Sequence, residues 1–410
     1  MDIQKINSIT AELHEITPEN VVMVGYGLKR TGGKFTNEMS IVFGVTEKKP
    51  LNQIPEGELL PSQIEIDGET LPTDVIETDV PQFLQACPPS FYTWQTTPPA
   101  NRGILRPLKG GLSITNFTSM NNSAGTMGFI AVDNQTNSLI GVTNAHVIID
   151  NAFTNSARTY NTITTNVAQD IVIQPSSIES GYVGQSNPIG VVKRYYPWLE
   201  YPKTNYVDCA LLTLNQSDIN TSTAYQQLGL TGWTAPMSFA SNSEIFGMVS
   251  SGTPLFSTGR TTGPKGEGSM KLIPYIYAAI NVGPTYNQGV TQAATRFVNC
   301  IGFVASASTT PSGYICNYPI AGGDSGSALI GEFGGVRKIV GQVFAGGTTV
   351  GYACPIDAIA TLMDISPYTG QTVNYSDTGA TQYHYVAGKD GTVNYTLSGN
   401  TFWQVGLDNC

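Results

Sequence analysis

Hydrophobic and polar positions alternate in short runs over most of this chain. From about residue 112 onward, each apolar run is bounded by turn-forming residues such as Gly, Pro, Asn or Ser. Short runs at this spacing are typical of the strands of an all-β sandwich or a pair of barrels. The runs are TMGFIAVD, SLIGVTNAHVI, DIVIQPS, PIGVVKRYY, YVDCALLTL, KLIPYIYAAI, RFVNCIGFVA, SALIGEF, KIVGQVFA and VGYACPI. The pattern predicts a mainly β protein with its core over residues 112–369.

The first 80 residues have a different pattern. Residues 4–17 have a helical period, with an apolar face formed by Ile6, Ile9, Leu13 and Ile16. Val21–Lys29 and Glu38–Thr46 predict the two strands of a hairpin, because a Gly/Thr/Asn-rich stretch joins them. A short β pair is expected around the Asp-Gly dipeptide at 67–68. We therefore predict a small α+β domain over residues 1–80.

Two further segments flank the β core. Residues 81–111 predict an ordered linker on a surface, since the segment is aromatic but interrupted by prolines at 81, 88, 89, 98, 99 and 107. After the last strand, Pro355 opens a predicted helix with an apolar face at Ile356, Ile359, Ala360 and Met363. Residues 370–410 are rich in Tyr, Thr, Asn and Gly and predict one or two hairpins, a short C-terminal β extension.

Charge and hydropathy narrow the function classes. The formal net charge is −10, and no Lys/Arg cluster has the size of a nucleic-acid footprint, so no nucleic-acid partner is expected. No apolar run reaches membrane-spanning length, and the start MDIQKINSITAELHEIT lacks the features of a secretory signal. We therefore expect no membrane partner and a cytoplasmic location. Export by another route, or incorporation in a particle, stays open.

The cysteines give no sign of a metal site. They stand at 87, 209, 300, 316, 354 and 410, with no CxxC pair and no histidine nearby at zinc-site spacing. We expect no metal and no other cofactor. Cys300, Cys316 and Cys354 flank a serine-bearing loop and could pair in an oxidising compartment, so the disulfide state stays open.

Three residues of the β core carry candidate chemistry. Ser325 stands among glycines in AGGDSGSALI, His146 ends the apolar run of LIGVTNAHVIID, and Asp208 opens the strand of VDCALL. Each alone has an ordinary explanation as a turn residue, a half-buried histidine or a strand-edge carboxylate. Together they follow the chain order His, Asp, Ser, which belongs to the chymotrypsin-type arrangement of acyl-transfer enzymes.

The contexts TNAHV, VDCALL and GGDSGSAL resemble those around the triad of trypsin-like serine proteases. The resemblance implies a chymotrypsin-like double β-barrel in which His146 is the base, Asp208 orients it and Ser325 is the nucleophile. It also implies an oxyanion hole formed by the N–H groups of Gly323 and Ser325, and a loop-supporting role for Asp324. In those enzymes a freed N-terminus commonly pairs with this acid, so Asp324 needs another partner here.

A narrower resemblance rests on GYGLKRTGGKFTNEMSIVFGVTEKKP, LPTDVIET, RPLKGGLSI, SAGTMGFIA and DIVIQPS. These stretches are similar to bacterial relatives of the plant narrow-leaf trypsin-like proteases, which carry a small N-terminal α+β domain before the double barrel. The resemblance covers residues from about 20 to 213 and from about 318 to 360. Residues 214–300 and the tail are outside it.

The resemblance also implies a substrate pocket walled by Pro319, Ile320, Phe344, Ala345, Gly346 and Tyr352. None of these is an acid, so we expect small or apolar residues before the cut bond. The sequence thus predicts a serine endopeptidase acting on a protein or peptide substrate, with homo-oligomerisation left open. One alternative is a catalytically silent protease-fold protein that serves as a structural or peptide-binding assembly component. Another is a viral-type processing protease that cleaves itself.

Overall fold

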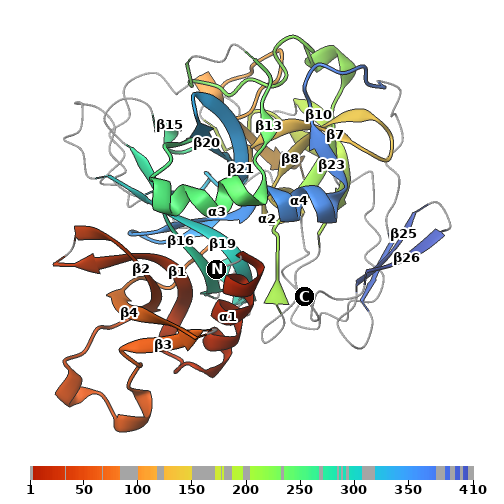
Figure 1. Cartoon of the computed structure of the whole chain (residues 1–410). Helices are drawn as coiled ribbons and strands as arrows, with labels where there is room; N and C mark the ends of the chain where they lie inside the picture. The colour runs from red at the N-terminus through yellow and green to blue at the C-terminus, as the bar shows by residue number, and fades with distance from the viewer. Residues whose placement is uncertain are drawn as a thin grey trace.

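Strands dominate the computed structural model of this chain (Figure 1). The residues that the structure describes are 3–32, 34–66, 68–83, 100–117, 124–149, 171–176, 178–179, 187–196, 204–231, 235–266, 271–283, 286–287, 290–291, 295–306, 319–374, 384–387, 393–397 and 400–404. Within these residues the strands form a 13-stranded sheet, an 8-stranded sheet and two small sheets. The predicted mainly β fold class is confirmed.

Part of the 13-stranded sheet closes into a barrel. Its strands are β14 (Leu255–Gly259), β16 (Leu272–Val282), β19 (Thr295–Ala305), β20 (Ala328–Phe333), β21 (Val336–Gly346) and β22 (Gly351–Pro355). Hydrogen bonding runs in the order β19, β22, β21, β20, β14 and β16, and β16 then pairs with β19. That last pairing leaves no edge, so the ring is closed. Three short strands attach to it: β11 (Thr204–Asn205), β13 (Ser238–Phe239) and β15 (Gly263–Lys265).

The 8-stranded sheet curls back on itself. Its order is β23 (Ile365–Pro367), β7 (Phe129–Asp133), β8 (Ser138–Thr143), β12 (Ala210–Thr213), β10 (Pro188–Tyr195), β9 (Ile171–Ile173), β5 (Leu112–Asn116) and β6 (Gly125–Met127). Only Gly128 separates β6 from β7, although the two strands lie near opposite ends of this order. The ends must therefore approach one another. A closed barrel beside a curled half-barrel agrees with the chymotrypsin-like arrangement that the resemblance implied.

The N-terminal residues extend the barrel sheet. They form α1 (Ile3–Ile16), β1 (Val21–Thr31), β2 (Lys34–Val45), β3 (Gln63–Ile66) and β4 (Glu69–Glu77). The predicted helix, hairpin and β3–β4 pair are therefore present. β1 pairs with β16, and Figure 1 shows the red N-terminal strands continuing below the barrel. The predicted domain boundary at residue 80 stays a prediction.

The remaining elements are short. α3 (Asn242–Ser251) and α4 (Ile356–Met363) lie across the molecule in Figure 1, and α2 (Ala145–Ile148) is a single turn. Beyond the barrels, β17 (Tyr286–Asn287) pairs with β18 (Val290–Thr291). In the tail, β24 (His384–Ala387), β25 (Val393–Leu397) and β26 (Asn400–Gln404) form the predicted hairpins.

Two local predictions need correction. The run SLIGVTNAHVI was predicted as one strand, but β8 ends at Thr143 and Ala145–Ile148 is helical. The backbone turns there because the N–H groups of Ala145 and His146 point at the carboxylate of Asp208. In α4, Pro355 is the N-cap and not the first helical residue.

Candidate active site

The carboxylate of Asp208 is fully buried and fully engaged. Its Oδ1 accepts hydrogen bonds from the N–H of Ala145 at 2.8 Å and of His146 at 3.3 Å. Its backbone carbonyl accepts from the side-chain amide of Asn144 at 2.6 Å. A buried carboxylate is costly unless donors surround it, and here the first turn of α2 supplies two of them. These bonds hold Asp208 against residues 144–146, which directly follow β8.

The imidazole of His146 completes this arrangement. Its Nδ1 lies 2.5 Å from Oδ2 of Asp208, and the side chains are 5% and 0% exposed. A carboxylate at this position makes Nδ1 the protonated nitrogen, which leaves Nε2 as the basic one. The structure thus brings together two of the three predicted triad residues, which are 62 positions apart in the sequence.

Ser325 lies on the other side of a shared neighbour, Phe83. The Ser325 hydroxyl is 3.4 Å from the backbone oxygens of Phe83 and of Phe344. The ring centroids of Phe83 and His146 are 5.2 Å apart. The serine and the histidine therefore both neighbour Phe83, the serine through the Phe83 backbone and the histidine through its ring. Ser325 is fully buried, so the site is closed in this conformation.

The serine loop uses glycines where side chains cannot fit. Gly323 and Gly326 have φ of +94° and +95°, a region that L side chains rarely adopt. A Cβ at Gly326 would lie 2.1 Å from the backbone oxygen of Thr126. The N–H of Thr126 donates a hydrogen bond to the backbone oxygen of Ser325 at 2.8 Å. Among the described residues, no acceptor takes the N–H of Gly323 or of Ser325. Both donors of the expected oxyanion hole are therefore uncommitted to the described part of the protein.

Asp324 has the partner that the sequence could not identify. Its Oδ1 accepts from the N–H groups of Thr261 at 2.8 Å and Thr262 at 2.9 Å. Its Oδ2 accepts from the Thr262 hydroxyl at 2.7 Å and from the N–H of Ala321 at 3.0 Å. The turn after β14 thus satisfies the carboxylate that a freed N-terminus pairs with in the proteases of the resemblance.

Neighbouring polar groups fix this turn in place. Arg260 donates its N–H to the Thr126 hydroxyl at 2.8 Å and its Nε to Glu179 at 2.6 Å. The end of the linker also contributes, since Asn101 donates to Gly259 O at 3.0 Å and Arg102 donates to Arg260 O at 3.0 Å. Thr261 and Thr262 lie in a region that the resemblance does not cover, so no sequence signal pointed to them.

The predicted pocket residues are all buried. Phe344 is the one that contacts Ser325, and a Cβ on Gly346 would meet Ile320 at 2.8 Å. The Tyr352 hydroxyl instead points to Met23 Sδ, 3.1 Å away in β1. The backbone of Pro319 accepts a hydrogen bond from Lys265 Nζ at 2.9 Å.

Lys265 is a buried cation that the sequence analysis missed. Burial lowers the pKa of this lysine to about 8, although the nearby charge of Asp324 opposes the shift. Lys265 lies behind the backbone of Pro319, which was predicted to wall the pocket. The carboxylate of Asp324 is itself engaged by the turn after β14.

Other candidate chemistry is sparse in the described part of the chain. Cys209, Cys300 and Cys354 are buried free thiols there, whereas Cys87, Cys316 and Cys410 are outside the described residues. Those residues contain no group of three or more His, Cys, Asp or Glu side chains arranged to hold a metal ion. Nor does the described part include a helix that is long and apolar enough to cross a membrane.

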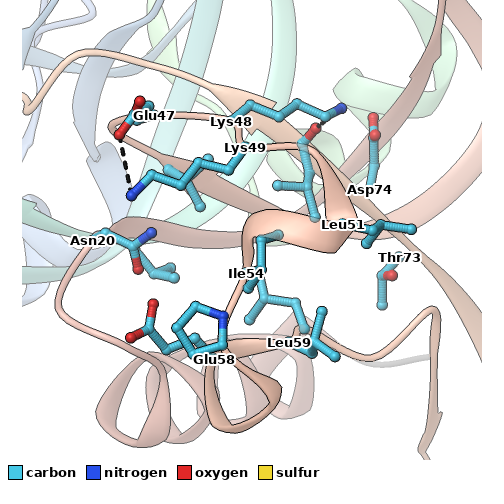
Figure 2. Close-up of a pocket in the computed structure, with 15 residues that line it drawn as sticks. Asn20, Glu47, Lys48, Lys49, Leu51, Ile54, Glu58, Leu59, Thr73 and Asp74 are labelled. Atoms are coloured by element: carbon cyan, nitrogen blue, oxygen red, sulfur yellow. Dashed lines mark hydrogen bonds and ion pairs between the residues drawn. The ribbon is translucent and has the colours of Figure 1, made fainter.

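A pocket of about 290 Å³ lies in the N-terminal region, far along the chain from the triad candidates (Figure 2). Leu51, Ile54 and Leu59 form its apolar wall, and Lys49 pairs with Glu47 at its rim, with 3.3 Å between Nζ and Oε2. All its lining residues lie between positions 20 and 75. None of the three triad candidates lines it, so it is separate from the candidate active site.

Comparisons with known proteins add little beyond the fold. No protein-family model and no curated protein matches this chain. One solved structure that matches is named Alpha-lytic protease homolog N4. It is 13% identical with a TM-score of 0.31, and the match covers 63% of this chain and 98% of that chain. We therefore base the fold class on the strand pairing itself and take nothing about the site from this match.

Proposed function

We propose that this protein is a serine endopeptidase of the trypsin-like type. The observation that carries the proposal is the buried His146–Asp208 pair, in which Oδ2 of the acid meets Nδ1 and Oδ1 is held by backbone N–H groups. The contact of the Ser325 hydroxyl with the backbone of Phe83, whose ring packs on His146, supports a common site for all three. The resemblance to bacterial relatives of the plant narrow-leaf proteases is part of this proposal.

In this mechanism the Ser325 hydroxyl attacks a peptide carbonyl while Nε2 of His146 takes its proton. Asp208, held by the N–H groups of Ala145 and His146, stabilises the imidazolium through its contact with Nδ1. His146 then gives the proton to the leaving amine. The acyl-enzyme is hydrolysed by water through the same steps, which returns the serine and releases the acid product.

The oxyanion of the tetrahedral intermediate needs donors that are fixed before the reaction. The N–H groups of Gly323 and Ser325 are the proposed donors, and one such donor is worth roughly 3 kcal/mol of barrier in related chemistry. Asp324 holds the loop between them through Thr261 and Thr262. The rigid support of this carboxylate favours a pre-formed oxyanion hole.

We further propose a preference for small or apolar residues before the cut bond. The buried Lys265 behind Pro319 and the engagement of Asp324 both disfavour a basic side chain there. A protein or peptide substrate and a cytoplasmic location stay predictions.

A catalytically silent, peptide-binding protein is the second candidate. The full burial of Ser325 favours it, because a closed nucleophile cannot reach a substrate. A closed enzyme should give Ser325-dependent cleavage under some condition, whereas a silent protein should give none.

A peptide-library digest tests the proposal. Wild type and Ser325→Ala are incubated with peptides derived from a whole proteome, and newly formed ends are identified by mass spectrometry. We expect ends that form only with the wild type, mainly after small or apolar residues. Dominant cleavage after Lys or Arg would contradict the specificity, and ends that form equally with Ser325→Ala would contradict the function.

A further inference from the structure

The segment from Asp79 to Phe83 crosses the candidate active site. It follows β4 directly, so the N-terminal region leads the chain into this position. Gln82 forms an isolated antiparallel bridge with Gly346, the last residue of β21. The Gln82 N–H lies 2.9 Å from Gly346 O, and the Gly346 N–H lies 3.1 Å from Gln82 O. This is strand addition, in which an extended segment pairs with the free end of a strand.

The next residue, Phe83, contacts both the histidine and the serine, the first through its ring and the second through its backbone. Its ring is 5.2 Å from that of His146, 5.9 Å from Phe297 and 6.1 Å from Phe344, measured between centroids. It is 4% exposed, and its backbone oxygen lies 3.4 Å from the Ser325 hydroxyl. The segment therefore lies against both candidate residues.

Among the described residues, one anchor of this segment is at the surface. Asp79 is exposed and accepts a hydrogen bond from the N–H of Thr348 at 2.9 Å and another from its hydroxyl. Pro81 accepts one from the Gly283 N–H at 2.8 Å. Gln82 itself is only half-buried. Apart from the buried Phe83 ring, these contacts are single hydrogen bonds and not a continuous ladder, which is the kind of contact that opens locally.

We propose that residues 79–83 are a built-in occupant of the peptide groove and hold the enzyme closed. This inference rests on the proposed endopeptidase function. A substrate strand must displace the segment before it can pair with Gly346. The ring pocket of His146, Phe297 and Phe344 then receives the substrate side chain that takes the place of Phe83. We therefore expect an apolar residue in the substrate at that position.

The test loosens the segment at its surface anchor. Asp79→Ala removes the acceptor for Thr348 without opening a cavity, and Phe83→Ala is a second, buried change. Glu69→Ala, an exposed acid of β4, is the matched control. Each variant is first compared with the wild type by thermal unfolding. The rate of labelling by a fluorophosphonate is then measured. We expect labelling about tenfold faster or more for Asp79→Ala, and an unchanged rate for Glu69→Ala.

A second readout does not depend on catalysis. Each variant is combined with Ser325→Ala, and a fluorescein-labelled peptide of residues 78–83, TDVPQF, is titrated with detection by anisotropy. We expect about tenfold tighter binding or more when Asp79→Ala is present, because the internal competitor is weakened. An unlabelled peptide with Phe replaced by Gly at its last position should compete poorly.

The outcomes separate the two proposals. Tighter peptide binding with no labelling of any variant supports the occupied groove and contradicts the endopeptidase. Labelling of folded Asp79→Ala and Phe83→Ala at the wild-type rate, together with unchanged peptide binding, overturns the built-in occupant and leaves the enzyme standing. Absence of both labelling and tighter binding overturns both.

Discussion

At the residue scale, Asp208 decides whether His146 can act as a base. Replacing it by Asn keeps the shape but places an amide opposite Nδ1, which favours the wrong tautomer of the imidazole. We expect Asp208→Asn to lower kcat/KM on the order of 10⁴-fold while the protein stays folded. Peptide hydrolysis and circular dichroism check this. A loss smaller than tenfold would mean that the pair is structural.

Asp324 is predicted to act by holding the proposed oxyanion donors, the N–H groups of Gly323 and Ser325, in position. A Cβ at Gly259 would lie 2.2 Å from its Oδ1, so Gly259→Ala must push the carboxylate away from Thr261 and Thr262. We expect a fall in kcat of more than about tenfold with little change in KM, because the oxyanion donors lose alignment. The control is Gly247→Ala, where the added carbon meets nothing within 4 Å. Equal activity of both variants would remove this role from Asp324.

His14 gives a prediction for the dependence of stability on pH. Burial, and next the charge of Arg296, lower the pKa of His14 to about 4 from its ordinary 6.5. Between these values the unfolded chain binds more protons than the folded chain, so the free energy of unfolding falls as pH falls from 6.5 towards 4. The loss from this one group is roughly 3 kcal/mol, at 1.36 kcal/mol per pH unit.

The measurement is urea unfolding at several pH values for the wild type and for His14→Gln. The variant should lose less stability over this range, because its side chain does not titrate. Parallel curves for the two proteins would show that the pKa of His14 is the same in the folded and unfolded chains, which would contradict the prediction.

At the element scale, the contact between β1 and β16 joins the N-terminal strands to the barrel. A Cβ at Gly25 would lie 2.5 Å from the backbone oxygen of Tyr277, a distance that the strands cannot accept without moving apart. We expect Gly25→Ala to lower the free energy of unfolding by about 2 kcal/mol or more. Gly57→Ala, in open space, is the control for chemical denaturation. Equal stability of the two variants would contradict close packing between these strands.

The elements that the sequence predicted well are those with strong local patterns. β16 and β19 are long apolar runs bounded by turn residues, and the N-terminal hairpin differs from its prediction mainly in a shorter loop. α3 was missed although a capping box of Ser241 and Glu244 marks its start and Gly252 its end. The local signal was present, but the helix lies in the stretch that the family resemblance leaves uncovered.

The site was predictable only in part, for a physical reason. His146, Asp208 and Ser325 stand in short sequence contexts that carry their own signal. Phe83 and Thr262 carry none, because their roles depend on contacts with residues far away in the chain: Phe83 with Ser325, Thr262 with Asp324. The local sequence of a proline-rich linker or a Thr-Thr turn does not predict such a contact.

At the scale of the whole molecule, the N-terminal strands and the linker attach to the catalytic region at two places. Residues 79–83 cover the serine, and Asn101 and Arg102 support the turn that holds Asp324. The region before the barrels is therefore in contact with both the candidate nucleophile and the turn that holds Asp324. This arrangement links the closed state of the site to the part of the chain that precedes it.

Mass-mapped labelling by a fluorophosphonate tests the central claim most directly. It is carried out on the wild type, on Asp79→Ala and on each of these combined with His146→Ala. We predict a single adduct on Ser325 that forms in the first two proteins and at least about 100-fold more slowly without the histidine. An adduct on another residue, or labelling of Ser325 at the same rate without His146, would contradict the account.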